Sequence, residues 1–130
     1  MLKRFDKNKA GLGCKGTIFG TSIFTKEIEG YLDELVWGYL KKGMKIQPHK
    51  HSQKEVYIFV NGKGTMQIGD KKMYVKKGDV AFIPSNTMHT AWNEDEEDLE
   101  FILVRTIKLG KWLRKIVKLL AITESMAVKK

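Results

Sequence analysis

The sequence predicts an all-β fold, a closed double-sheet barrel of the jelly-roll kind, followed by a C-terminal amphipathic helix. Short segments rich in β-branched and aromatic residues follow one another along most of the chain, and turn residues separate them. Residues 61–64 (Asn-Gly-Lys-Gly) and Gly69-Asp70 are typical of hairpin turns. No helix-length segment intervenes between these strands, which argues against a βαβ fold. With 130 residues, the chain has the size of one domain.

Eight or nine strands are expected. The first two segments, residues 17–24 and 35–40, mix β-branched and aromatic side chains between glycines. The others are residues 46–51, 55–60, 65–68, 73–75, 80–83, 88–92 and 99–106. Because side chains alternate between the two faces of a strand, each segment offers one face to the interior of the barrel.

The period of the apolar residues changes near the C-terminus. Between residues 111 and 121 they recur at helical intervals, with basic side chains on the opposite face, after a break at Gly110. We expect residues 1–106 to form the barrel and residues 107–130 to form a basic amphipathic helix and tail. The apolar stripe is expected to pack on the barrel or on a partner subunit. Contact with an anionic membrane surface is a weaker alternative, and basic charge alone supports no specific nucleic-acid binding.

All three histidines stand at spacings suited to metal ligands. His49 and His51 are separated by one residue, so on a strand both side chains point to the same face. Glu55 follows on the next stretch of strand, and a facing strand that carries His89 would close a set of three imidazoles and one carboxylate. This mixed set suits borderline divalent metals and leaves one or two coordination positions for water or substrate. It does not distinguish manganese, iron, cobalt, nickel, copper and zinc.

Glycines and a proline frame the four residues at regular spacings. Residues 43–62 read G-x5-H-x-H-x3-E-x6-G, and residues 78–93 read G-x5-P-x-N-x2-H-x3-N. These two stretches resemble the paired signature motifs of the cupin superfamily at every spacing, and the resemblance covers roughly residues 34–104. Asn86 stands where the family usually has glycine, and asparagine tolerates the left-handed backbone that a turn needs there. The resemblance implies the same barrel in a small single-domain, metal-binding protein.

Each ligand residue also has a simpler interpretation. A single histidine in an apolar strand is more often a core or surface residue than a ligand, and an H-x-H pair alone decides little. Cupins that have lost the metal usually lack a ligand residue too, whereas none is missing here. We therefore expect one divalent metal ion. Its ligands would be His49, His51, Glu55 and His89.

Strand alternation also predicts what lies beside the metal. The face of the two motif histidines carries Gln47, and the face of Glu55 carries Tyr57 and Phe59. Gln47 and the Tyr57 hydroxyl are expected as polar contacts, because a buried amide needs hydrogen-bond partners. Phe59 is explained at least as well as barrel core. No residue beyond the ligands stands out as a catalytic acid or base.

Charge is distributed in blocks. The net charge is +9, yet an acidic run at residues 94–98 and Glu100 follows the second motif, and the basic excess gathers at the C-terminus. We expect a solvated acidic loop that pairs weakly with the basic tail, within a protomer or across a dimer. No arginine lies in the motif segments, which argues modestly against a doubly charged carboxylate substrate. Only Arg105, at the end of the last strand, is placed to reach a barrel mouth.

The composition indicates in which cellular compartment the protein is expected. No apolar run approaches the length of a membrane span, and the N-terminus has positive charge without the apolar core of a signal peptide. Cys14 is the only cysteine, which excludes an internal disulfide and is typical of a buried or inert thiol in a reducing compartment. We therefore expect a cytoplasmic protein.

Three classes of function fit these observations. The first is a metalloenzyme acting on a small molecule, of the dioxygenase, isomerase or decarboxylase type. The second is a non-catalytic module that binds a sugar or small metabolite, and the third is an attachment role for the basic tail. The complete ligand set favours the first over the second, because a pure binder needs no open metal site. The cupin resemblance also implies a homodimer, with residues 17–24 as the candidate contact.

Overall fold

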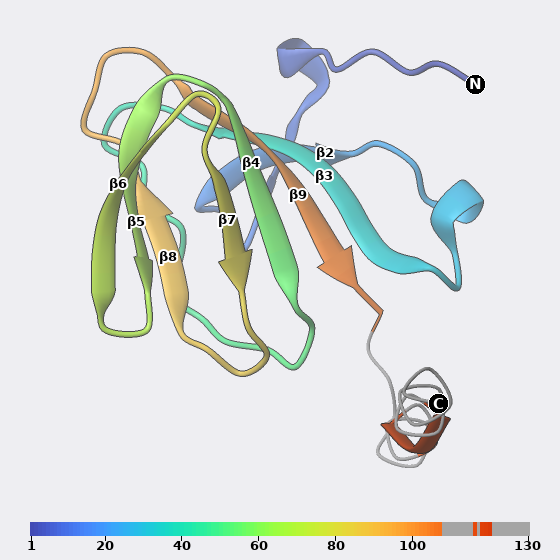
Figure 1. The fold of residues 1–130 in the computed structure, drawn as a ribbon. Coiled ribbons are helices and arrows are strands. Elements are labelled where there is room, and N and C mark those ends of the chain that lie inside the picture. The colour runs from blue at the N-terminus through green and yellow to red at the C-terminus, as the bar shows by residue number, and fades with distance from the viewer. Residues whose placement is uncertain (108–115, 117, 121–130) are drawn as a thin grey trace.

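Two β-sheets face each other across one apolar core in the computed structural model, which describes residues 1–107, 116 and 118–120 (Figure 1). Over these residues the first sheet has six strands in the order β1-β2-β3-β9-β4-β7, and the second has three in the order β6-β5-β8. All neighbours are antiparallel. The strands are β1 (Gly11–Gly13), β2 (Ile18–Ser22), β3 (Leu32–Leu40), β4 (Glu55–Asn61), β5 (Lys63–Ile68), β6 (Lys71–Lys76), β7 (Val80–Ile83), β8 (His89–Trp92) and β9 (Leu99–Thr106). The 3-10 helices are η1 (Lys7–Lys9) and η2 (Lys26–Ile28).

The predicted all-β architecture is confirmed, and two segments depart from the prediction. The sequence did not indicate β1, because its Gly-Leu-Gly stretch has little strand propensity of its own; it forms against β2. Residues 46–51 form no continuous strand: isolated bridges at Lys45 and His49 join this segment to β8. Pro48 has no N–H to donate to a ladder, which explains the interruption.

The C-terminal helix predicted for residues 111–121 lies mostly outside the described residues. Residues 116 and 118–120 are helical. Within the described part of the chain, no helix is long and apolar enough to cross a membrane. The dimer contact expected at residues 17–24 stays a prediction; in the monomer, β2 is hydrogen-bonded to β1 on one edge and to β3 on the other.

The turn at Gly62 is not the hairpin that its sequence indicates. β4 pairs with β7 and β9, whereas β5 pairs with β6 and β8, so Gly62 carries the chain from one sheet to the other. The hairpin at Gly69-Asp70, between β5 and β6, is confirmed. Gly62 has a φ of +77°, and a Cβ atom there would lie 2.1 Å from the carbonyl oxygen of Asp98. Only glycine fits this crossing.

The inner faces of the two sheets form the core, and the second motif ends inside it. The buried apolar cluster consists of Leu40, Ile46, Tyr57, Phe59, Met66, Val75, Ala81, Ile83, Ala91, Leu99, Phe101 and Leu103. Asn93 is fully buried, and its amide donates to the carbonyls of Leu40 and Glu97 at 2.9 and 2.8 Å. Its side-chain oxygen accepts from the N–H of Asp95 at 2.9 Å. Asn93 therefore ties the acidic loop to the end of β3.

The acidic loop has basic partners in the described part of the chain. Lys7 lies 2.9 Å from Asp98 and 3.4 Å from Glu100, and Lys42 pairs with Glu96. The expected pairing with the basic C-terminal tail falls on residues that lie mostly outside the described part. Such exposed pairs contribute little stability individually.

Alanine substitutions at two glycines separate the stability cost of a left-handed backbone conformation from the cost of a steric clash. Gly16 and Gly62 share a φ of +77°, but a Cβ atom at Gly16 meets nothing within 4 Å. We expect Gly16→Ala to cost about 1–2 kcal/mol of unfolding free energy from the left-handed conformation alone. Gly62→Ala, which must also displace the backbone at Asp98, is expected to cost roughly 3–5 kcal/mol. Urea unfolding of both variants tests this, and equal losses would contradict it.

Candidate metal centre

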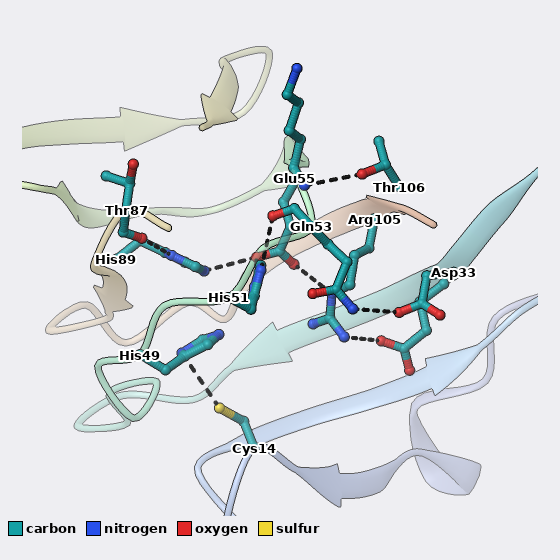
Figure 2. Close-up of polar contacts among 12 residues, drawn as sticks. Cys14, Asp33, His49, His51, Gln53, Glu55, Thr87, His89, Arg105 and Thr106 are labelled. Carbon is teal, nitrogen blue, oxygen red and sulfur yellow. Dashed lines mark hydrogen bonds and ion pairs between the residues drawn. The ribbon is translucent and has the colours of Figure 1, made fainter. Parts of the chain in front are cut away.

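The four predicted ligand residues meet at one end of the barrel (Figure 2). Glu55 begins β4 and His89 begins β8, while His49 and His51 lie on the segment that leads into β4. Backbone hydrogen bonds in both directions hold His49 against His89, with N···O distances of 3.3 and 3.0 Å. One potential ligand atom from each of the four residues lies within 4.8 Å of the others. The structure therefore brings together the whole set that the sequence predicts.

Each histidine ring is oriented by a hydrogen bond from its Nδ1 atom. His49 Nδ1 lies 2.7 Å from the carbonyl of Gln47, and His89 Nδ1 lies 2.9 Å from that of Thr87. His51 Nδ1 lies 2.9 Å from the carbonyl of Gln53. A carbonyl oxygen only accepts, so Nδ1 must donate in all three rings. In the neutral rings, the Nε2 lone pairs are left for another partner.

The Nε2 atoms of two rings crowd one carboxylate oxygen. Glu55 Oε1 lies 2.7 Å from His51 Nε2 and 2.8 Å from His89 Nε2. The Glu55 side chain is fully buried, and His89 Nε2 is buried without a hydrogen bond of acceptable geometry. Neutral rings would place nitrogen lone pairs against a carboxylate oxygen, which is repulsive. A cation between these atoms resolves the conflict, either protons on the rings or a metal ion.

The donor set fits a metal ion. Three imidazole nitrogens with their other N–H groups already committed, and one carboxylate oxygen, are the ligands that borderline divalent metals prefer. The geometry thus agrees with the predicted cluster of histidine and glutamate residues that could hold a metal ion. Asn86, in the second motif, has a φ of 55°, so the left-handed turn expected at this position is confirmed.

Arg105 supports the carboxylate from the side away from the histidines. Its Nε lies 3.2 Å from Glu55 Oε2, and its Nη1 lies 2.8 Å from Glu34 Oε2. Burial alone would raise the pKa of the Glu55 carboxyl, but contact with His89 and the charges of Arg105 and His51 outweigh burial, so the pKa lies below its ordinary value. The expectation of a pocket without arginine is therefore wrong, whereas the exception made for Arg105 at the end of the last strand is met. Arg105 lies outside both motifs and 50 residues from Glu55 in sequence, and it reaches the site because β9 runs beside β4.

A cavity of about 260 Å³ opens next to His49 and is lined by residues of β1, β2, β3, β4 and β9. His49, Tyr57 and Arg105 contribute to its wall. So does Cys14, whose sulfur lies 3.8 Å from His49 Nδ1. No motif or spacing in the sequence indicates this position for Cys14. Burial raises the pKa of the Tyr57 hydroxyl far above its ordinary value, so this group is neutral and available as a hydrogen-bond donor.

The other two predicted pocket residues have different positions. Phe59 is buried in the core against Tyr57 and Phe101, as its simpler interpretation required. Gln47 is exposed, contrary to the expected buried amide. Strand alternation fails there because the segment is interrupted at Pro48. Gln47 contributes through its backbone instead: its N–H donates to Thr17 and its carbonyl orients His49.

Comparison with known proteins agrees with this geometry. The family model described as a cupin domain matches residues 36–105, more than half of the chain. The chain belongs to the cupin superfamily. The matched part of this cupin contains all four candidate ligands and Arg105.

Relatives of this cupin include proteins with and without an assigned activity. An uncharacterised protein of Methanocaldococcus jannaschii is 31% identical over 90 residues, which cover 68% of this chain and 72% of that protein. The H2HPP isomerase of Bacillus subtilis is 27% identical over 79 residues, covering 60% of this chain but only 34% of the isomerase. A crystal structure of a predicted oxalate decarboxylase of Thermotoga maritima shares the fold: TM-score 0.73, 24% identity, 83% of this chain and 100% of the other.

The stability of the metal-free cupin is expected to fall in acid through His49. Burial lowers the pKa of His49 below the ordinary value of 6.5, against the raising effect of the Gln47 carbonyl. His49 binds its proton less tightly in the folded protein than in the unfolded chain. The free energy of unfolding is therefore highest above the pKa that His49 has in the unfolded chain, and it falls as the pH decreases toward the lower pKa of the folded protein. We expect the unfolding free energy, measured with urea in the presence of a chelator, to decline from about pH 6.5 downward. A His49→Gln variant should lose that part of the decline, and an identical pH profile would contradict the prediction.

Proposed function

We propose that this cupin is a metalloenzyme that acts on a small molecule, with one divalent metal ion held by His49, His51, Glu55 and His89. The observation that carries the proposal is a cluster of one nitrogen from each of three histidines and one buried carboxylate oxygen, all within 4.8 Å of one another, next to a cavity of about 260 Å³. This volume lies just below the usual range for ligand pockets, about 300–1,000 Å³. A small metabolite fits it better than a polymer.

The proposed roles of the chain's residues follow from their contacts. Each Nδ1–H···O=C hydrogen bond fixes a ring so that Nε2 points at the centre. When bound, the metal would supply Lewis acidity or a redox centre. Tyr57 lines the cavity, and its hydroxyl, kept neutral by burial, would donate a hydrogen bond to a substrate oxygen. The apolar wall around it, including Ile18 and Val36, would limit access of water.

A non-catalytic module that binds a sugar or small metabolite is the alternative. It shares the cavity and the metal with the first proposal but requires no turnover. The enzyme is favoured because the cavity reaches His49, one of the four candidate ligands, so a substrate in it would lie next to the metal. The match to an isomerase also favours an enzyme over a binding module, although it covers only a third of that protein.

Metal content tests the proposal first. We expect protein purified without an affinity tag to contain close to one equivalent of a transition metal by elemental analysis. His49→Ala and His89→Ala should lose it, since each removes one of the nitrogens. The matched control is Cys14→Ala, which alters the cavity wall beside His49 and should keep the metal. A wild type that stays metal-free after reconstitution would overturn the metalloenzyme proposal.

Turnover separates the two proposals. Oxygen uptake with a small-molecule panel tests iron- or copper-loaded protein, and isomerase and decarboxylase screens test manganese- or zinc-loaded protein. Tyr57→Phe is expected to retain the metal and to lower the turnover by about tenfold to a hundredfold, because one hydrogen bond to the reacting group is lost. Ligands that bind to the metal-loaded protein and are recovered unchanged would favour the binding module.

A further inference from the structure

A row of charged side chains crosses three neighbouring strands next to the candidate metal centre. Arg105 of β9 is the register partner of Glu34 in β3 on one side and of Glu55 in β4 on the other. Both contacts are formed: Arg105 lies 2.8 Å from Glu34 Oε2 and 3.2 Å from Glu55 Oε2. The two carboxylates therefore hold the guanidinium from both sides. Figure 2 shows its contact with Glu55.

The two oxygens of Glu55 are divided between different partners. Oε1 faces His51 and His89 at 2.7 and 2.8 Å, whereas Oε2 faces Arg105. The Glu55 side chain is fully buried, so no solvent competes for either oxygen. A carboxylate can bind a metal ion through one oxygen or through both. A charged hydrogen bond to Oε2 makes the two-oxygen mode costly, because that bond would have to be weakened or broken.

We propose that Arg105 is a positioning residue that reserves Glu55 Oε2, so that Glu55 offers the metal a single oxygen and one coordination position stays open for a substrate. The inference rests on the proposed metal site and assigns a role to a residue outside both motifs. Glu34 acts indirectly, because it contacts the guanidinium of Arg105, which in turn contacts Glu55 Oε2.

A merely structural role for Arg105 makes the opposite prediction. If Arg105 only held the site together, its loss would disorder Glu55 and weaken metal binding by about 10–100-fold. If it restricts Glu55 to one oxygen, its loss frees Oε2 to bind. The lost positive charge would then also favour a dication nearby. Metal affinity would be kept or increased, while the affinity of an added ligand for the metal would fall.

The test uses cobalt(II) as the metal and imidazole as the added ligand. Imidazole at pH 8 is neutral, so the lost charge of Arg105 does not itself change its binding. Visible spectra of cobalt-loaded wild type and Arg105→Gln report the coordination number, because cobalt with more ligands absorbs less strongly. We expect Arg105→Gln to bind cobalt at least as tightly as the wild type and its cobalt form to absorb more weakly. Its affinity for imidazole is expected to be lower by about tenfold or more.

Two further variants keep the test decisive. Glu34→Gln leaves Arg105 in place but loosens it, and Glu34 is partly exposed, so this variant is expected to fold; its imidazole affinity should fall less, in the same direction. Lys42→Gln removes a surface cation paired with Glu96 and should match the wild type in every measurement. Circular dichroism and thermal unfolding of the metal-free proteins confirm that each variant is folded.

The outcomes distinguish the inference from the proposed function. A wild type that binds no cobalt overturns both. A wild type that binds cobalt, with Arg105→Gln and Glu34→Gln unchanged in spectrum and imidazole affinity, overturns only the role of Arg105. Loss of cobalt affinity in a folded Arg105→Gln also overturns it, because that result assigns Arg105 to holding the site together.

Discussion

The hydrogen bonds from three histidine Nδ1 atoms to backbone carbonyls are the constraint on which the site depends. Each carbonyl belongs to a residue two positions away from its histidine: Gln47 for His49, Gln53 for His51 and Thr87 for His89. Because the acceptors are backbone atoms, the ring orientations are fixed by the path of the chain. The tautomer follows from the same bonds, since a carbonyl can only accept. The barrel thus sets which nitrogen each ring presents before any metal binds.

Burial of the Glu55 carboxylate is the main unfavourable electrostatic contribution at the site. A fully buried carboxylate is strongly disfavoured unless it is paired, and here its two oxygens have separate cationic or potentially cationic neighbours. The lowered pKa of Glu55 indicates that these neighbours more than offset its burial. Two residues at the start of β3 support this region. Glu34 holds Arg105, while the adjacent Asp33 accepts a hydrogen bond from the side chain of Gln53, whose carbonyl orients His51.

A register shift between Leu32 and Glu34 explains how two consecutive acidic residues reach one site. On a regular strand Asp33 and Glu34 would point to opposite faces. The irregularity leaves Asp33 unpaired with β9 at the edge of the ladder, where it contacts Gln53, while Glu34 keeps its place opposite Arg105. Irregularities of this kind recur beside functional sites, where they redirect a side chain.

Much of the fold and the ligand set could be predicted from the sequence because both depend on local patterns. Strand propensity and turn residues located β7 and β9 at their observed bounds, and motif spacing identified the four ligand residues. The contacts that support the ligands could not be predicted in this way. Arg105 reaches Glu55 through a pairing of strands 50 residues apart, and nothing near it in sequence records that contact. Gln47 is exposed because the strand alternation that predicts it to face inward is interrupted at Pro48. The hairpin expected at Gly62 failed because turn chemistry does not determine which sheet the next strand joins.

The most direct test of the central claim is diffraction from crystals of the metal-loaded protein, measured at the absorption edge of the bound metal. The account predicts one anomalous peak within bonding distance of the Nε2 atoms of His49, His51 and His89 and of Glu55 Oε1, with all three Nδ1 hydrogen bonds kept. A peak bound through an Nδ1 atom, or a metal located away from these four residues, would contradict it.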